Sequence, residues 1–325
     1  MKTGTTQFER HVPVWLVVSA FATVYVVWGS TYLAIRFSVE TIPPFLMAGM
    51  RNVVAGSLLF ALARLRGGES PTRLQWRDAA IAGGLMLLIG NGGVTLAEKT
   101  IPSGVAALLV ALTPAWMVVF DWLRPKGVRP GPLVVLGIAI GFAGVALLAR
   151  NRPSDGGSAY GLGVMLLMAS SIGWALGSIF NRGANKPALL LTAGGMQLIA
   201  GGVLLLGASA LSGELKTFSL SQVTLKSFGS WLYLMLAGSL VSYTVYIWLL
   251  QVSTPARVST NAYVNPLIAV LLGSTIGREP LSHDVLVAGA LIITAVVLVL
   301  RGGAAKAARK QETLAMRPQP CPSTE

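Results

Sequence analysis

The sequence has few charged residues and almost no cysteine or histidine. Asp, Glu, Lys and Arg make up 11% of its 325 residues, whereas a soluble domain carries about 25%. Apolar residues make up 54%, and the mean hydropathy is +0.68. A soluble fold of this size cannot hide so much apolar surface, because folded proteins still expose a large share of their residues. The composition excludes a soluble or a disordered chain and indicates an integral membrane protein.

The scarcity of reactive side chains excludes several kinds of site. Cys321 is the single cysteine, so the chain holds no internal disulfide, cysteine metal cage or redox pair. His11 and His283 are far apart in sequence, and none of the HExxH, GxSxG, Walker or GxGxxG motifs occurs. We therefore expect no metal, no cofactor and no enzyme activity. An intramembrane enzyme is the remote alternative, and it would need a nucleophile, base or metal set deep in the bilayer.

The net charge of +13 does not indicate a nucleic-acid partner. The Lys and Arg residues lie in short loops between apolar runs, and they form no basic stripe between aromatic residues. Loops of this kind carry the orientation signals of membrane proteins. The predicted partners are therefore the lipid bilayer and a small-molecule substrate, with no nucleic acid.

Ten apolar runs are long enough to cross a bilayer core of about 30 Å as helices, which takes about 20 residues each. We interpret the first as a retained span rather than a secretory signal, because it is longer than a signal's apolar region. The ten predicted spans are 14–35, 44–63, 78–97, 102–122, 132–149, 160–181, 188–211, 230–250, 256–276 and 284–300.

The distribution of basic residues predicts the orientation. With both termini in the cytoplasm, 17 Lys and Arg residues fall inside and 7 fall outside, as the positive-inside rule requires. We therefore expect a multi-pass protein of the inner cell membrane with both termini cytoplasmic. The expected parts are a cytoplasmic N-terminal tail (1–13), two five-span repeats (14–151 and 152–301) and a disordered cytoplasmic tail (302–325).

The two halves resemble each other at a nearly constant offset. Trp28 corresponds to Trp174, 146 residues later, and Pro114 corresponds to Pro266, 152 residues later. Each half holds five spans, an odd number, so the second half must enter the membrane with the opposite orientation. The fold class predicted is all-α, with ten transmembrane helices as two inverted five-helix repeats. Such repeats are typical of transporters, whose substrate site lies near the midplane between the halves, although they also occur in channels.

Several motifs resemble those of a known family. They are Trp28-Gly29-Ser30-Thr31, Pro43-Pro44, Gly49-Met50-Arg51, Gly90-Asn91-Gly92, Ala97-Glu98, Pro102-Ser103-Gly104-Val105-Ala106-Ala107, Tyr263-Val264-Asn265-Pro266 and Gly277-Arg278-Glu279-Pro280. With these motifs the chain resembles the EamA family of the drug/metabolite transporter superfamily, near its YedA-like exporters. The resemblance covers about residues 14 to 301. It implies a ten-helix fold and export of small metabolites from the cytoplasm, without implying a substrate.

Arg51 is the one charged residue near the middle of a predicted span. A central Arg costs about 2.5–3.5 kcal/mol on insertion scales, so it should face the bundle interior or a wet cavity. It is a candidate to bind a substrate carboxylate, and Gln197 is its neutral counterpart in the second half. The alternative is a structural Arg that caps the carbonyls of a broken helix or fixes helix packing.

A polar stripe is predicted along the third span. Asn91, Thr95 and Glu98 lie at positions i, i+4 and i+7, on one face of a helix that the glycines around Asn91 weaken. Asn91 and Thr95 are candidate cavity residues, with close helix packing as the alternative. Glu98 is a candidate for proton coupling, against the alternative of a solvated loop carboxylate. Facilitated export without coupling remains open.

Span 9 and the aromatic residues supply the other candidates. Asn261, Tyr263 and Asn265 are candidate binding residues, and Pro114 and Pro266 are candidate hinges or static bends. The deeper aromatic residues and their polar neighbours suit a small amphipathic ligand, with an interfacial aromatic belt as the alternative. The candidates of this group are Trp28, Tyr32, Trp116, Trp174, Ser178, Tyr243 and Tyr246.

Spans 5 and 10 lack strongly polar side chains and contrast with the others. Gly137, Gly141 and Gly144 form a small-residue face on span 5, which favours tight helix packing. We expect these two spans to serve as scaffold or as the interface of a homodimer.

The function that these features favour is an inner-membrane transporter that exports small amphipathic metabolites or drugs by alternating access. Amino acids or their derivatives are the first candidates, because Arg51 can meet a carboxylate and the aromatic rings can meet an apolar side chain. A cavity that opens on one side and touches Arg51, Asn91 and Tyr243 is expected. The alternatives are a channel-like facilitator and an importer of a similar solute.

Overall fold

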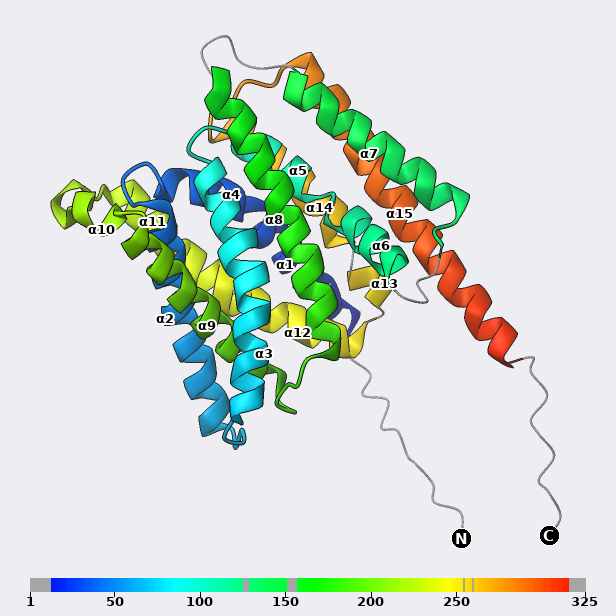
Figure 1. Cartoon of the computed structure of the whole chain (residues 1–325), viewed down its shortest axis with the longest axis horizontal. Helices are drawn as coiled ribbons and strands as arrows, with labels where there is room; N and C mark the ends of the chain where they lie inside the picture. The colour runs from blue at the N-terminus through cyan, green and yellow to red at the C-terminus, as the bar shows by residue number, and fades with distance from the viewer. Residues whose placement is uncertain (1–12, 125–128, 151–156, 254, 259, 316–325) are drawn as a thin grey trace, which may run out of the picture.

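The computed structural model describes residues 13–124, 129–150, 157–253, 255–258 and 260–315. These residues form helices and connecting turns, with no strand among them (Figure 1). His11, Cys321, residues 1–12 of the predicted N-terminal tail and residues 316–325 of the predicted C-terminal tail lie outside the described residues. The described chain confirms the all-α fold class.

The first half of the chain supplies five membrane-crossing units, of which the third and fourth are each made of consecutive segments. The elements in chain order are α1 (Val14–Ser38), α2 (Pro44–Leu65), α3 (Arg73–Gly83), the π-helix η1 (Gly84–Asn91), α4 (Gly92–Ala97), α5 (Ser103–Val110), α6 (Thr113–Leu123) and α7 (Pro132–Arg150).

The second half repeats this order, with two short helices inserted between its second and third units. Its elements are α8 (Gly157–Gly183), α9 (Leu190–Leu211), α10 (Glu214–Thr217), the 3-10 helix η2 (Leu220–Gln222), α11 (Leu225–Tyr233), the π-helix η3 (Leu234–Val241), α12 (Ser242–Val252), α13 (Pro255–Val258), α14 (Asn261–Thr275) and α15 (His283–Ala315).

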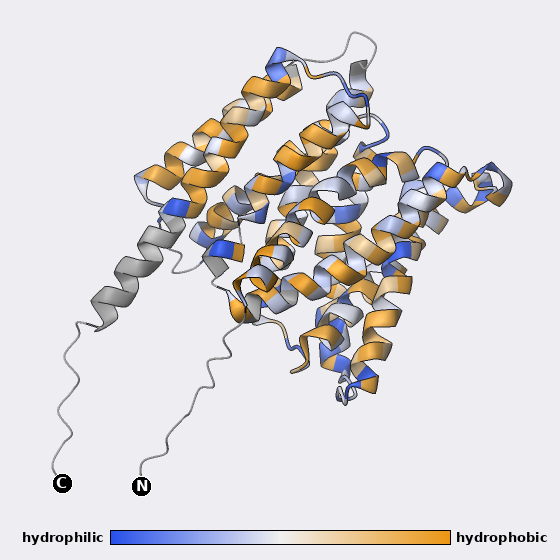
Figure 2. Cartoon of the chain, turned by 180° about the vertical axis from the view of Figure 1, so that it is seen from behind, coloured by the Kyte–Doolittle hydropathy of each residue, from blue (hydrophilic) through white to orange (hydrophobic). Residues whose placement is uncertain are grey.

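Nine helical segments of the described chain are long and apolar enough to cross a membrane. The expected ninth span, 256–276, is divided into α13 and α14, so neither piece alone reaches the required length. Helix α15 continues to Ala315, thirteen residues beyond position 302, where the C-terminal tail was expected to begin. Apolar residues cover the helices along their length, and hydrophilic residues gather in the connections (Figure 2).

The helix contacts obey an approximate two-fold symmetry between the halves. The second units, α2 and α9, pack against each other, and so do the fifth units, α7 and α15. The first unit of each half packs against the fourth unit of the other, α1 on α14 and α8 on α5 and α6. Each first unit also contacts the third unit of the other half. This pattern is what two inverted copies of a five-helix unit produce.

Glycine allows α2 and α9 to approach closely. A Cβ atom on Gly56 would lie 2.7 Å from the backbone nitrogen of Ile199, and one on Gly202 would lie 2.8 Å from that of Val53. Small residues at such crossings let helices in membranes gain van der Waals contact without side chains in the way. The glycine face of α7 serves the same purpose against α15, because Gly137 lies against Leu298 and Val299.

The third units of the two halves share an unusual helix geometry. Each begins at a threonine cap, Thr72 or Thr224, whose hydroxyl accepts from a backbone N–H three residues later. Each then changes from α- to π-helix for eight residues, at η1 and at η3. Wider turns of this kind are rare and cluster at functional positions in helices. The π-helix η1 ends at Asn91, within the stretch where glycine was expected to weaken the helix.

The two ends of the bundle differ in which helices begin and end there. The proximal end is the one where α1 and α7 begin and α2 ends, and the distal end is the one where α1 ends and α2 and α5 begin.

Candidate functional site

Arg51 lies inside the bundle and bonds to the third unit. Its side chain is 6% exposed, and its Nη2 donates to Oδ1 of Asn91 at 2.8 Å. Its Nε has no hydrogen-bond acceptor among the described residues. Arg51 follows Pro44, the first residue of α2, by seven positions, which places it about 10 Å from the distal end of the helix. The capping alternative would require a bond to the backbone carbonyls of a broken helix. The observed bond goes to a side chain instead.

Thr95 and Glu98 continue the stripe from Asn91 toward the distal end. Thr95 is fully buried and its hydroxyl donates to the carbonyl of Asn91 at 2.7 Å, so the hydroxyl is used within the helix. Glu98, the residue directly after the span Arg73–Ala97, is 1% exposed. This burial does not fit the alternative of a solvated loop carboxylate.

The carboxyl group of Glu98 is buried near charged side chains, and no ion pair or hydrogen bond joins it to them among the described residues. Neither Oε1 nor Oε2 has a hydrogen-bond donor within the described part of the chain. Burial raises the pKa of this carboxyl well above its ordinary value, and the nearby Glu279 carboxylate raises it further. The charges of Arg36 and Arg51 act in the opposite direction, as does the backbone of Arg36, which approaches the carboxyl without reaching full hydrogen-bond geometry. Burial has the largest effect, because a low dielectric disfavours the charged form.

The second half contributes two side chains beside η1. The indole of Trp174 lies where a Cβ on Gly90 would be, 2.5 Å from Trp174 Cδ1, which explains why glycine precedes Asn91. Gln197 donates through Nε2 to the sulfur of Met86 at 3.2 Å. Ser178 lies one turn beyond Trp174 on α8 and is half-buried. The duplication thus brings Trp174 and Gln197 to the π-helix that ends at Asn91.

Tyr32, on α1, joins this group of residues through Glu98. It is half-buried and packs against the main apolar core, and it is close enough to Glu98 to interact electrostatically. We call Arg51, Asn91, Glu98, Tyr32 and Trp174 the Arg51 cluster. Its members come from α1, α2, the third unit and α8.

A second group of candidates lies between α1 and the second half. The rings of Trp28 and Tyr246 are 4.9 Å apart, and Trp28 Nε1 donates to the carbonyl of Gly238 at 3.2 Å. The phenol of Tyr243 lies against Gly194 on α9, where any side chain would collide with it. These contacts close the space between α1, α9 and α12.

Asn265, one of the candidates of α14, lies where this helix approaches α1. The backbone carbonyl of Asn265 would lie 3.1 Å from a Cβ on Gly29, so the two helices almost touch there. The Oδ1 of Asn265 is buried and has no donor among the described residues. Asn261 is half-buried at the start of α14, and Tyr263 packs against the main apolar core. No hydrogen bond within the described residues joins these three residues to the Arg51 cluster.

Trp116 lies apart from these groups. Its ring is 6.0 Å from that of Phe120 and 5.2 Å from that of Phe142, so it packs on α7. The structure therefore places it beside a helix that we expected to be scaffold, and it does not bring it to Arg51.

The two candidate hinge prolines lie in fourth units that are both interrupted. The interruption between α5 and α6 falls at Ala111 and Leu112, just before Pro114. In the second half α14 begins at Asn261, and Pro266 is buried inside it. Both fourth units thus combine an interrupted helix with a proline, which cannot donate a backbone hydrogen bond.

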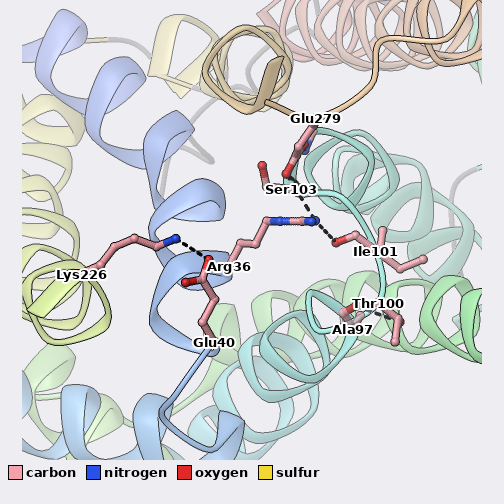
Figure 3. Close-up of polar contacts among 9 residues, drawn as sticks. Arg36, Glu40, Ala97, Thr100, Ile101, Ser103, Lys226 and Glu279 are labelled. Atoms are coloured by element: carbon pink, nitrogen blue, oxygen red, sulfur yellow. Dashed lines mark hydrogen bonds and ion pairs between the residues drawn. The ribbon is translucent and has the colours of Figure 1, made fainter. Parts of the chain in front are cut away.

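One group of contacts at the distal end was not predicted from the sequence. Glu279, in the turn after α14, accepts from the backbone N–H groups of Ser103 and Gly104 at 2.8 and 3.1 Å, and its Oε1 lies 3.4 Å from Nη1 of Arg36 (Figure 3). The same guanidinium donates to the carbonyl of Ile101 at 3.4 Å. We call this group the Glu279 clamp, because it ties the second half to α1 and α5.

The clamp uses the chemistry of a helix N-terminus. The first N–H groups of a helix have no partner within the helix, and a carboxylate satisfies them. Glu214 repeats the arrangement by accepting from the N–H groups of Phe45 and Leu46 at the start of α2. The Pro-Ser-Gly sequence that opens α5 signals such an N-terminus, but the sequence does not indicate which carboxylate reaches it.

The proximal end contains a cavity of about 370 Å³ between α2, α9 and α12. Its lining does not include Arg51, Asn91 or Tyr243, so it does not meet the expectation of a cavity that touches these three. Leu189 and Leu191 line the cavity and belong to the same apolar cluster as Tyr243. The residues that line it are Arg66, Ala188, Leu189, Leu190, Leu191, Thr244 and Trp248.

The sequence profile of the EamA-like transporter family matches residues 15–150 and 161–301, which correspond to the two halves of the fold. An Escherichia coli K12 protein, described as the uncharacterized inner membrane transporter YedA, is 39% identical over 91% of this chain and 93% of its own. The uncharacterized transporter YvbV of Bacillus subtilis is 27% identical over 84% of this chain and 88% of its own. Protein PecM of Dickeya dadantii has the same identity over the same shares.

A solved crystal structure supports the fold independently. It is 21% identical to this chain, covers 87% of it and 96% of its own chain, and superposes with a TM-score of 0.56. The similarity shows the fold alone. The family profile, by contrast, matches most of the sequence, and the apolar helices agree with membrane transporters as relatives. The chain belongs to the EamA-like transporter family of membrane proteins.

Proposed function

We propose that this transporter exports small amphipathic metabolites or drugs by alternating access, with Arg51 as the group that binds a carboxylate of the solute. Amino acids and their derivatives are the solutes that this chemistry fits first. The observation that carries the proposal is the environment of Arg51. The side chain is 6% exposed, its bonded partner is the neutral amide of Asn91, and its Nε is unpaired among the described residues.

An unbalanced guanidinium inside a bundle favours an anionic ligand. A buried charge is stable when it is paired and hydrogen-bonded, and Arg presents a planar fork that matches a carboxylate. Tyr32 is close to Glu98 and Trp174 packs against Gly90, next to Asn91, so the two rings offer apolar surface near the proposed site. A zwitterionic or anionic solute with an apolar side chain meets both requirements.

The two ends of the bundle support alternating access. The Glu279 clamp holds the distal end together, while the proximal end contains the 370 Å³ cavity. We propose that both termini are cytoplasmic and that the cavity is the cytoplasmic entrance. In this arrangement a solute enters beside Tyr243, and opening toward the other side requires the clamp to separate.

Exchange in liposomes tests the proposal. Liposomes that hold the full chain and are loaded with unlabelled phenylalanine should take up labelled phenylalanine against its gradient, because a carrier returns with cargo whereas a channel does not. Arg51→Ala should abolish this exchange.

The matched control is Arg64→Ala, on the exposed end of the same helix, where Nη1 donates to the carbonyl of Gly68 at 2.7 Å. It should exchange like the unmodified protein. Normal exchange by Arg51→Ala would contradict the role of Arg51. Downhill flux without exchange would indicate the channel-like alternative, and chemical conversion of the phenylalanine would indicate an enzyme.

A further inference from the structure

Glu98 is a buried acid that packing does not explain. It is 1% exposed, and both carboxyl oxygens lack a hydrogen-bond donor among the described residues. An ionised carboxylate left in such a position is very unfavourable, so a group there takes up a proton instead. The position of Glu98 therefore favours its carboxylic acid form, whose proton can be released where water or a counter-charge reaches it.

The groups around Glu98 come from several elements. Tyr32 and Arg36 approach it from α1, Arg51 from α2, and Glu279 from the turn after α14. On α8 the titratable group near this end is Tyr160, whose hydroxyl donates to the carbonyl of Leu148 at 3.4 Å.

The two arginines near Glu98 differ in how far their charge is balanced. Arg36 is paired with Glu279 in the clamp, with 3.4 Å between Nη1 and Oε1. Arg51 has the neutral amide of Asn91 as its hydrogen-bond partner. Arg36 acts on Glu98 more strongly than Arg51 does, but Glu279 already balances the charge of Arg36. The charge that an ionised Glu98 would newly compensate is therefore that of Arg51.

We propose that Glu98 is a proton-binding site that is coupled to the carboxylate site at Arg51. This inference rests on the proposed function. When Glu98 is protonated, Arg51 keeps an uncompensated positive charge and binds the carboxylate of a solute. When Glu98 is ionised, its negative charge balances Arg51 and competes with the solute. The step is the association of one proton with one carboxylate oxygen of Glu98, and no other bond forms or breaks.

The linkage has a definite sign and size. Because the proton and the solute carboxylate bind together, the affinity for the solute rises as the pH falls through the titration of Glu98. Two charges separated by more than direct contact, in the partly screened interior of a protein, change the affinity by a factor on the order of ten. A proton should cross the membrane in the same direction as each carboxylate.

The first test detects the proton without any solute. Dicyclohexylcarbodiimide is apolar and reacts with protonated carboxyl groups in apolar surroundings. The full chain, reconstituted in lipid, should form an adduct at Glu98 that peptide mass spectrometry locates. Glu40, a half-exposed carboxylate paired with Lys226 at 2.6 Å, should remain unmodified. Absence of an adduct at Glu98 would overturn the proposal.

The second test measures the coupling. Phenylalanine binding to the purified chain should strengthen by roughly tenfold from mildly alkaline to mildly acidic pH, a range over which both charged groups of phenylalanine stay ionised. Glu98→Gln resembles the protonated acid, so it should bind phenylalanine tightly at every pH. The matched control, Glu40→Gln, should keep the pH dependence of the unmodified protein.

The outcomes separate this inference from the proposed function. Binding that is independent of pH in the unmodified protein, or that keeps its pH dependence in Glu98→Gln, would overturn the role of Glu98 and leave the carboxylate site at Arg51 standing. Failure of the unmodified protein to bind phenylalanine at any pH would contradict the proposed function instead. In liposomes, a phenylalanine gradient alone should acidify the receiving compartment with the unmodified protein and leave it unchanged with Glu98→Gln.

Discussion

Removal of the Glu279 side chain should loosen the distal end more than any other single change there. Glu279→Ala deletes the acceptor of two backbone N–H groups, those of Ser103 and Gly104, and the partner of Arg36. The carboxylate is 7% exposed, whereas the Arg36 side chain is 36% exposed. The two amide bonds therefore carry most of the effect, because solvent screens the ion pair.

The magnitude follows from these contacts. Hydrogen bonds to a charged acceptor contribute about 1.5–3 kcal/mol each, and the exposed ion pair adds about 1 kcal/mol or less. The N–H groups at the start of α5 regain water when the end opens, so the net loss of stability should be about 3–5 kcal/mol. Glu279→Gln keeps one carbonyl acceptor and should lose about half of that.

Thermal unfolding of the purified full chain provides the first assay. The apparent melting midpoint should fall in the order unmodified protein, Glu279→Gln, Glu279→Ala. Glu69→Gln, which alters an exposed loop carboxylate, should melt like the unmodified protein.

Thiol labelling shows where the loosening occurs. Cys321 is the single native cysteine, so a Cys321→Ser background allows one reporter to be placed at Ser38, a fully buried residue at the distal end of α1. Ser38→Cys should react faster with a maleimide when Glu279→Ala is added. Unchanged labelling together with an unchanged melting midpoint would refute the clamp.

Two further predictions follow from the packing and from the helix order. Gly90→Ala places a Cβ 2.5 Å from the Trp174 ring and should cost about 1–3 kcal/mol of stability. The control, Gly84→Ala, has its nearest neighbour at 3.4 Å and should not destabilise the protein. Equal melting midpoints of the two variants would contradict the contact between Gly90 and Trp174. Reporter domains fused to the two termini should be accessible from the same side of the membrane, and accessibility from opposite sides would exclude an even number of spans.

Much of the fold could be predicted from the sequence because the membrane imposes length and apolarity on every span. The spans, the duplication and the inverted order all follow from runs of about 20 apolar residues and from matches such as Trp28 with Trp174. The π-helical geometry of the third units could not be predicted from the sequence. The π-helices η1 and η3 depend on how neighbouring helices pack, which periodicity alone does not express.

Candidate residues could be predicted from the sequence where a polar or charged side chain is energetically unfavourable in a membrane. Arg51 and the stripe from Asn91 to Glu98 are conspicuous because lipid does not tolerate them, and the structure joins Arg51 to Asn91. The partners that lie far apart in sequence were not predictable. Glu279 and Ser103 are 176 positions apart, and nothing local in either segment indicates the other. Trp116 was grouped with the site because of its depth, but its neighbours place it on α7.

The most direct test of the account is whether Arg51 recognises a carboxylate. Binding of phenylalanine and of phenylalaninamide, which lacks the carboxylate, should be measured for the unmodified chain and for Arg51→Ala. The unmodified chain should prefer phenylalanine, and Arg51→Ala should lose that preference, with phenylalanine binding weakened by roughly thirtyfold or more because a buried charge loses its partner. Equal binding of phenylalanine by the two proteins would contradict the account.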